Sequence, residues 1–324
     1  YTGGGCPHIL AEPQRTNLYP YSNDTTTWVK SNFPATNNYA ISPDGTQNAF
    51  RGVSTSNASL LYIGSTGSAG TNTISIYAKS NTDSDQKFRF FGNGNTTQST
   101  DQTATQEWQR FEYTETYSFI TWGLLGASVS GTNDILFYGM QHEVGSYPTS
   151  LIPTNGEAGG VTRNQDIFTR DGIGSLINST EGVLFVEMAA LSNDSTYRGI
   201  SLNKNDGTAN NRIVIFFWNA SNELLIRSTI NGVTKINETI NLVSETDYNK
   251  IAISYKLNNW KIYVNGSLEA AITNASALVF PSGTLDNLSF DSTLNSNPFY
   301  GKVKQLQVYD TALTDEQLLQ LTGE

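Results

Sequence analysis

The sequence predicts an all-β protein: two antiparallel β-sandwich domains in tandem, with one short helix near the C-terminal end. Short runs that alternate apolar and polar residues recur along the chain, and Asn, Gly and Ser residues separate them, which is typical of strands joined by tight turns. Charged residues make up only 15% of the chain. An average domain has roughly 25%, so long solvated helices are not expected. The 324 residues are enough for two domains, at about 150 residues each.

The predicted domain boundary lies in residues 153–161, where Pro153 and three glycines interrupt the strand pattern. We therefore assign the first domain to residues 1–155 and the second to residues 156–324. The strands predicted before the boundary span residues 73–79, 87–91, 110–116 and 134–143. Those predicted after it span residues 183–190, 212–218, 223–229, 250–256, 260–264 and 302–309.

Two local motifs in the second domain predict a turn and a helix. Asn265-Gly266 directly follows the strand at residues 260–264, and this dipeptide favours the type I′ turn of a β-hairpin because both residues tolerate positive φ. Near the end of the chain, Thr314 and Gln317 have the spacing of a capping box, and leucines follow at helical intervals. We expect a short helix that ends at Gly323.

Charge and composition exclude several partners. The net charge is −10, and no clustered basic residues offer a surface for nucleic acid or anionic lipid. The longest strongly apolar run, residues 213–218, has six residues, far fewer than the roughly 20 of a membrane-spanning helix, so no membrane insertion is expected. Cys6 is the single cysteine and excludes an internal disulfide. The chain begins at Tyr1 without an apolar leader, as expected of a piece of a longer protein.

Segments at both ends of the first domain resemble a known module. Residues 12–18, followed by Tyr21 and Trp28, resemble the opening of a jelly-roll module that occurs in phage tail proteins, other virion-surface proteins and bacterial surface proteins. Residues 138–154 resemble its closing strand and exit, and residues 162–166 resemble the usual lead into a second domain. The module is similar to carbohydrate-binding modules, so the resemblance implies a jelly-roll sandwich.

The second domain is similar to concanavalin A-like lectins of the laminin G-like kind. The similarity lies in residues 181–187, residues 260–266 and residues 308–318, where a strand leads into the capped helix. The two resemblances together imply a non-catalytic glycan recognition or adhesion module at the surface of a phage virion, as in a tail or capsid fibre, or at a bacterial cell surface. They also imply a homo-oligomer or a part of a larger virion assembly.

Residues for catalysis are sparse. His8 and His142 are the only histidines, and neither accompanies a Gly-x-Ser-x-Gly nucleophile motif. Retaining glycosidases need two carboxyl groups about 5 to 5.5 Å apart. The strand at residues 183–190 carries only Glu187, and no Glu-x-Asp-x-Glu pattern occurs. We therefore predict that the protein is not an enzyme. Two alternatives stay open: a purely structural virion protein without sugar binding, and a polysaccharide-degrading enzyme whose carboxylates meet only in space.

Two polar segments have spacing that would suit a structural calcium ion. Asn81, Asp83 and Asp85 alternate like the start of a calcium loop, although the turn Gly and the late Glu of an EF-hand are missing. Asn205 and Asp206 form a similar pair before Gly207. Plain turns are the alternative explanation for both segments. No other cofactor is indicated.

Sugar binding needs exposed aromatic rings for the C–H faces of pyranoses, and amide or charged groups for their hydroxyls. In the first domain, three aromatic residues border polar or Gly-containing segments and are predicted to be exposed: Trp28, Tyr39 and Trp122. In the second domain, Trp218 and Asn219 end a strand at a loop and are the predicted ligand residues. Trp260 alternates with apolar residues and is predicted to be buried.

A charged pair is predicted in the first domain. In the resembled module the first and last strands are neighbours, so Arg15 and Glu143 are expected to pair across this seam, with Gln141 adding hydrogen bonds. We assign this group to fold maintenance rather than to ligand binding.

Overall fold

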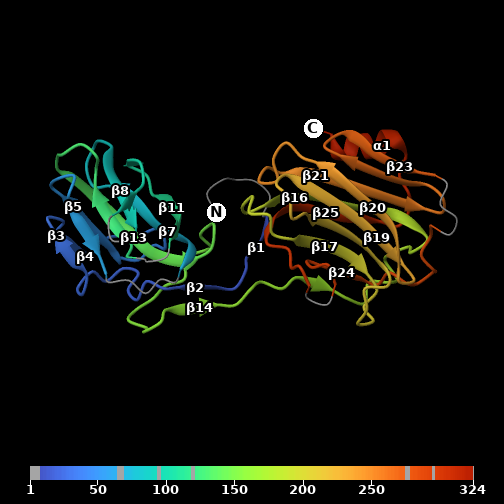
Figure 1. Ribbon diagram of the computed structural model, residues 1–324, viewed down its shortest axis with the longest axis horizontal. Helices are drawn as coiled ribbons and strands as arrows, with labels where there is room; N and C mark the ends of the chain where they lie inside the picture. The colour runs from blue at the N-terminus through green and yellow to red at the C-terminus, as the bar shows by residue number, and fades with distance from the viewer. Residues whose placement is uncertain are drawn as a thin grey trace. The chain divides into compact units, whose positions relative to one another are not determined.

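The computed structural model describes residues 8–63, 69–92, 96–117, 121–273, 278–293 and 296–323. The chain forms two compact units. The first unit is Pro13–Gln165, and the second unit combines Tyr1–Glu12 with Asp166–Glu324. Both consist of antiparallel sheets (Figure 1), and the one helix among the described residues is α1 (Asp315–Thr322). The predicted all-β fold with a short C-terminal helix is confirmed.

The first unit packs two sheets around an aromatic core. One sheet has the strand order β10-β8-β12-β6-β3, with β9 paired to β8, and the other has the order β11-β7-β13-β5-β4. Phe50, Phe88 and Phe137 lie between the sheets with their rings in contact. The strands of the first sheet are β3 (Val29–Ser31), β6 (Leu60–Tyr62), β8 (Gln86–Gly92), β9 (Thr97–Gln98), β10 (Gln102–Ala104) and β12 (Gly123–Gly126). Those of the second are β4 (Ala35–Ala40), β5 (Ala49–Ser54), β7 (Gly70–Ser80), β11 (Gln109–Tyr117) and β13 (Asn133–Val144).

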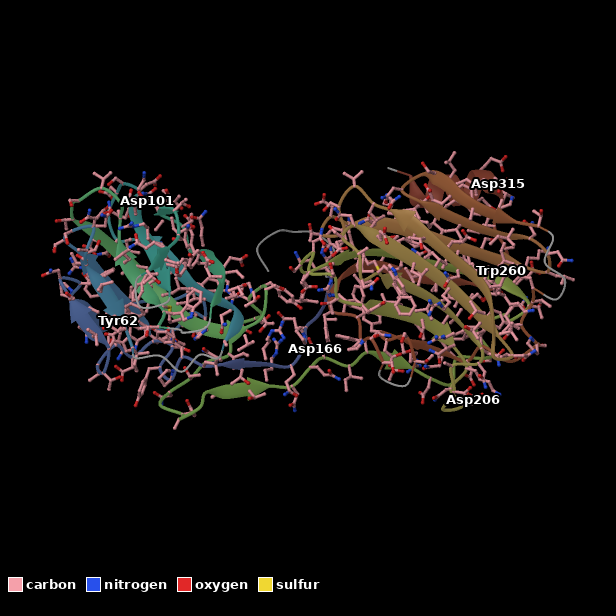
Figure 2. The ribbon with its side chains drawn as sticks, in the orientation of Figure 1. Tyr62, Asp101, Asp166, Asp206, Trp260 and Asp315 are labelled. Atoms are coloured by element: carbon pink, nitrogen blue, oxygen red, sulfur yellow. The ribbon has the colours of Figure 1, made fainter. Side chains whose placement is uncertain are left out.

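The second unit is also a two-sheet sandwich. One sheet has the order β1-β25-β16-β21-β22-β23, and the other has the order β15-β24-β17-β18-β19-β20. The first sheet contains β1 (Ile9–Ala11), β16 (Glu181–Ala190), β21 (Asn249–Lys256), β22 (Trp260–Val264), β23 (Ser267–Ile272) and β25 (Gly301–Tyr309). The second contains β15 (Thr169–Arg170), β17 (Arg198–Asn203), β18 (Arg212–Phe217), β19 (Glu223–Ile230), β20 (Val233–Asn241) and β24 (Asn287–Ser289). Trp260 (Figure 2) is 1% exposed, and its Nε1–H donates to Leu278 O, so its predicted burial is confirmed.

The compact units divide the chain at different points from the predicted boundary at residue 155. β1 belongs to the second unit because it completes the edge of a sheet there, where Ile9 pairs with Val303 and Ala11 enters the core. Residues after 155 belong to the first unit because β14 (Val161–Arg163) pairs with β2 (Arg15–Asn17). The chain therefore passes between the units twice, and the Pro/Gly-rich segment alone did not reveal this.

The predicted hairpin turn and helix cap are both formed. Asn265 has φ 47° and Gly266 has φ 79°, the positive values that a type I′ turn needs. At the start of α1, the Thr314 hydroxyl accepts from the Gln317 N–H, and the Gln317 side chain accepts from the Thr314 N–H. None of the helices in the described part of the chain is long and apolar enough to cross a membrane.

Replacing the cap residue tests how much α1 depends on it. We expect Thr314→Ala to lower the free energy of unfolding of the second unit by about 1 kcal/mol, because the Gln317 N–H loses its acceptor. Thr314→Ser keeps a hydroxyl at the same place and is expected to stay within about 0.5 kcal/mol of the parent. Urea denaturation measures both, and equal losses for the two variants would contradict this role.

Candidate functional site

The outward face of the sheet β15-β24-β17-β18-β19-β20 is the candidate site, and we call it the Trp218 face. Strand β18 shows how it arises. Ile213, Ile215 and Phe217 point into the sandwich core, so Val214 and Phe216 between them point outward. Trp218 continues this alternation directly after the strand and packs against Phe216.

The strand register aligns the outward side chains in three rows that cross the sheet. One row is polar: Asn287, Asn203, Arg212, Thr229 and Thr234. The middle row contains Thr169, Ser289, Ser201, Val214, Arg227 and Asn237. The third row contains Gly199, Phe216, Leu225 and Thr239. These three rows, all of described residues, contain two arginines and no carboxylate.

Aromatic rings meet at one end of the Trp218 face. The rings of Tyr197 and Trp218 are perpendicular with centroids 4.5 Å apart, and the Phe216 ring lies 6.1 Å from Trp218. The Arg227 guanidinium lies 5.7 Å from the centre of the Trp218 ring and 6.0 Å from that of Phe216. Its Nε–H donates to the Asn237 side chain at 3.0 Å, which fixes its orientation. Tyr197 and Trp218 stay partly exposed, so their rings are available to a ligand.

A glycine makes room for this packing. A Cβ atom at Gly199 would lie 3.0 Å from the Phe216 ring and 3.3 Å from Val214. Because no side chain stands there, the Phe216 ring lies close over β17 and is only 2% exposed. The Phe216 ring at the aromatic end is therefore closely packed against strand β17.

The polar end is held by buried hydrogen bonds. The Asn203 side chain donates to the hydroxyls of Ser201 at 2.7 Å and Ser289 at 3.0 Å. Arg212 donates to Ser292 O and to the Thr293 hydroxyl. Burial and the nearby charge of Arg227 lower the pKa of Arg212. The carboxylate of Asp291, which accepts from the Ser289 hydroxyl of the middle row, acts on the pKa of Arg212 in the opposite sense.

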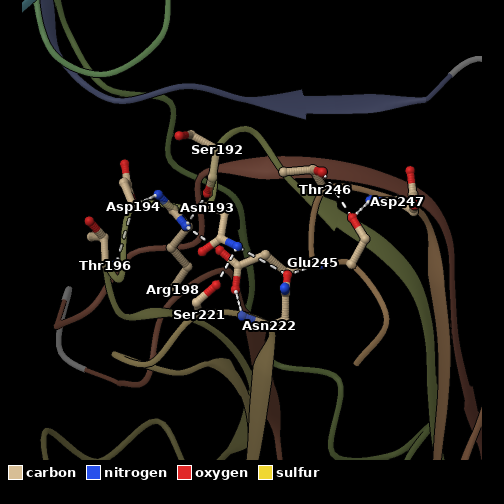
Figure 3. A network of polar contacts seen from close by, with 11 residues as sticks. Ser192, Asn193, Asp194, Thr196, Arg198, Ser221, Asn222, Glu245, Thr246 and Asp247 are labelled. Atoms are coloured by element: carbon tan, nitrogen blue, oxygen red, sulfur yellow. Dashed lines mark hydrogen bonds and ion pairs between the residues drawn. The ribbon is translucent and has the colours of Figure 1, made fainter. Parts of the chain in front are cut away.

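A buried polar network holds the loops that carry Tyr197 and Trp218 (Figure 3). Arg198 is 1% exposed; its guanidinium donates to Asp194 and to Ser192 O, and lies 3.9 Å from Glu245 Oε1. Glu245 in turn accepts from the Asn222 N–H at 3.1 Å, and its own N–H donates to the Asn222 side chain at 3.0 Å. Burial raises the pKa of Glu245, against the opposing effects of the Asn222 N–H and the Arg198 charge.

The structure separates the predicted ligand residues. Trp218 lies on the face just described, and Asn219 follows it as an exposed residue. Tyr39 lies in the other unit, 44% exposed, with the Arg51 guanidinium 5.2 Å from its ring centre. The exposure predicted for Trp28 and Trp122 is wrong, because they are 4% and 1% exposed in the core of the first unit.

Local geometry explains both errors. The polar residues before Trp28 form a tight turn in which the Trp28 N–H donates to Thr25 O, and the turn directs the indole against Tyr19 and Phe50. Gly123 after Trp122 is not a loop residue: a Cβ there would lie 2.4 Å from that of Tyr62. The glycine marks close packing inside the sheet.

The predicted pair of Arg15 and Glu143 does not form among the described ion pairs. The strand neighbourhood is as expected, since Leu18 N–H donates to His142 O beside it. However, the Glu143 carboxylate accepts from Gln141 at 2.6 Å and from the N–H and hydroxyl of Thr149 at 2.9 and 2.6 Å. Arg15 instead lies over the Tyr147 ring, 5.3 Å from its centre. The hydrogen bond from Gln141 is thus present without the arginine.

The two calcium candidates are hydrogen-bonded turns in this structure. The Asn81 side chain donates to Asp134, Asp85 accepts from Gln106, and Asp83 is exposed. Asn205 N–H donates to Asp286, and Asp206, labelled in Figure 2, accepts from the hydroxyl and N–H of Thr208, which lowers its pKa. Within the described ranges, no group of three or more His, Cys, Asp or Glu side chains is arranged to hold a metal ion. Calcium binding stays a prediction.

Sequence reasoning missed Tyr197, Phe216 and Arg227. One signal was present: residues 213–218 are apolar at every position, whereas a strand with one solvated face alternates. This pattern indicates that the outward face is covered or binds something. It could not show that Tyr197 and Arg227, from other strands, would meet there.

A comparison with protein-family models finds a match in the second unit. Residues 184–319 match the family model described as the concanavalin A-like lectin/glucanases superfamily. The matched stretch lies within the second unit, where the sequence resemblance had been noted. No curated protein matches the chain.

Several solved structures align with about half of the chain. The CBM40 of the Ruminococcus gnavus IT-sialidase, bound to α2,3-sialyllactose, has 18% identity over 48% of this chain and 98% of its own, with a TM-score of 0.40. A leech intramolecular trans-sialidase has 19% identity over 48% of this chain and 28% of its own, with a TM-score of 0.38. Sheep galectin-11 has 7% identity over 44% of this chain and 97% of its own, with a TM-score of 0.31.

Proposed function

We propose that this protein recognises glycans through the Trp218 face and does not transform them. The observation that carries the proposal is the cluster of Tyr197, Phe216 and Trp218 beside the Arg227 guanidinium. Aromatic rings contact the apolar C–H surface of a sugar ring. Arg227 and its neighbour Asn237 offer hydrogen-bond donors to hydroxyl or carboxylate oxygens, and Asn219 follows Trp218 in the chain.

The chemistry of the face supports binding rather than hydrolysis. A glycosidase of the usual kind needs two carboxyl groups across the scissile bond. The three outward rows supply amides, hydroxyls and two guanidinium groups, and the row of Trp218 adds the single carboxylate of Glu223. We propose that the setting is the surface of a phage virion or of a bacterium, as the resemblance of the first domain implies. There, many copies of the protein would together bind a glycan-bearing surface strongly, although each single contact is weak.

Replacing Trp218 tests the proposal. We expect Trp218→Ala to weaken binding of the best glycan in a panel of neutral and sialylated oligosaccharides by about tenfold, or about 1.4 kcal/mol, because the stacking surface is lost. Isothermal titration calorimetry on the full chain measures the change. Tyr62→Ala is the matched control, since Tyr62 is a partly exposed aromatic residue on β6 of the other unit. It should bind like the parent protein.

Two results would contradict the proposal. One is the absence of binding to every glycan of the panel at millimolar concentration, together with stable oligomers, which would favour a purely structural role. The other is loss of binding in Tyr62→Ala but not in Trp218→Ala, which would place the site elsewhere. New reducing ends after incubation with the bound glycan would contradict the non-catalytic part.

A further inference from the structure

A sheet of the first unit also has an outward face that carries aromatic rings and positive charge, and we call it the Tyr77 face. It is the outward side of the sheet β11-β7-β13-β5-β4. Ile76, Ala78 and Phe137 point into the core, so Tyr77 and Tyr138 point outward. The register places Arg110 opposite Tyr77 and Tyr77 opposite Tyr138, in one row across three strands.

The next row adds more charge. Lys79, Leu136 and Arg51 lie side by side on β7, β13 and β5. Arg51 is neutralised, because its Nε and Nη2 groups donate to the two carboxylate oxygens of Asp134 at 2.8 and 2.6 Å. Lys79 has no such partner among the described ion pairs. The row on the opposite side of Arg110 and Tyr77 contains Glu112 and Ser75.

Arg110 is oriented but not neutralised. Its Nη2 group donates to the Ser75 hydroxyl at 2.9 Å, and its guanidinium lies 5.5 Å from the centre of the Tyr77 ring. Its Nε–H is buried without an acceptor. Glu112, two residues along the same strand, is exposed, and no ion pair between it and Arg110 is present among the described residues. An arginine held by a hydroxyl and a ring keeps donor groups for an anionic ligand.

The rings of this face are also fixed. The Tyr77 and Tyr138 centroids lie 6.0 Å apart, and the Tyr138 hydroxyl donates to Asp44 at 2.9 Å. Tyr77 remains partly exposed beside Arg110. A ring surface next to two cations without carboxylate partners is notable in a chain of net charge −10. The combination of an exposed ring and two cations indicates an anionic ligand that also has an apolar ring face.

We infer that the Tyr77 face binds an oligosaccharide that carries a carboxylate group. The sugar ring stacks on Tyr77, and the carboxylate accepts hydrogen bonds from Arg110 and Lys79. This site lies on a different sheet from the Trp218 face and does not depend on the function proposed for it. A simple anion site would need the cations but not the exposed ring.

Calorimetry with the full chain tests this inference. The probes are trigalacturonate and sialyllactose, which carry carboxylates, with neutral galactotriose and lactose as their counterparts, and inorganic phosphate as a simple anion. We expect at least one acidic probe to bind about tenfold more tightly than its neutral counterpart. Arg110→Gln should remove this preference, and Tyr77→Ala should weaken binding of the acidic probe. Lys87→Gln, an exposed lysine on β8 of the other sheet, is the matched control and should change nothing.

Four results would overturn the inference. They are no binding of either acidic probe, equal binding of acidic and neutral probes, an unchanged preference in Arg110→Gln, and competition by phosphate at the same concentration as the sugar. If Trp218→Ala removes the acidic preference while Arg110→Gln keeps it, the acidic sugar binds the Trp218 face instead. Unchanged melting of Arg110→Gln excludes loss of fold as the cause.

Discussion

Arg198→Met is expected to lower the free energy of unfolding of the second unit by about 3 to 5 kcal/mol, the range for removing one partner of a buried ion pair. Arg198 and Glu245 each have side chains 1% exposed, so Glu245 would be left buried without its cation. Asp194 and Ser192 O would lose the hydrogen bonds that Arg198 donates in the same step. Urea denaturation followed by hydrogen exchange of second-unit peptides measures the loss.

A second substitution separates charge from packing. Adding Glu245→Gln to Arg198→Met removes the stranded charge while the Asn222 N–H keeps an acceptor, so part of the lost stability should return. Arg170→Met, at an exposed arginine of β15, should change stability by less than about 0.5 kcal/mol. Equal effects of Arg198→Met and Arg170→Met would show that the network does not stabilise the fold.

The same variant links the fold to the proposed function. Arg198 holds the loop before β17 that carries Tyr197, and Asn222 holds the loop that follows Trp218. Loosening these loops separates two rings that now lie 4.5 Å apart. Glycan binding by Arg198→Met is therefore expected to fall even where the unit remains folded.

The sequence predicted a structural feature correctly where that feature depends on one short segment of the chain. Trp260 lies in a strand of alternating residues, and its burial follows from that alternation alone. The capping box at Thr314 and the Asn265-Gly266 turn are also local, because each depends on residues that are adjacent in the chain. Such elements were predicted with the right residues.

Sequence reasoning failed where the outcome depends on contacts between distant segments. Whether Trp122 is exposed depends on Tyr113 and His142, which pack against it from other strands. The Trp218 face likewise needs a register between β17, β18 and β19 that no single segment encodes. The error at Glu143 is of another kind, because Thr149, only six residues away in the chain, satisfies the carboxylate that was expected to pair with Arg15.

A buried histidine is expected to make the first unit sensitive to acid. His142 is 2% exposed between Trp122 and Asn72, and its Nε2 lies 3.1 Å from Asn72 Oδ1. Burial lowers the pKa of His142 to about 4, from an ordinary value of 6.5. The unfolded chain therefore takes up the proton at a higher pH than the folded chain does. The stability that this difference supplies is complete above about pH 6.5 and is lost as the pH falls to about 4.

Between pH 7 and pH 4 the free energy of unfolding of the first unit is expected to fall by about 3 kcal/mol because of His142. This follows from about 1.4 kcal/mol for each unit of pKa difference. Hydrogen exchange followed by mass spectrometry measures it for first-unit peptides in the full chain. Carboxylates also titrate in this range, so the informative quantity is the difference from His142→Gln, whose side chain stays neutral. The variant should show a flatter fall of stability with acid, whereas the Trp260-containing peptides of the second unit should behave alike in both proteins. Parallel pH profiles for the first unit in the two proteins would show that His142 is not the group that destabilises it.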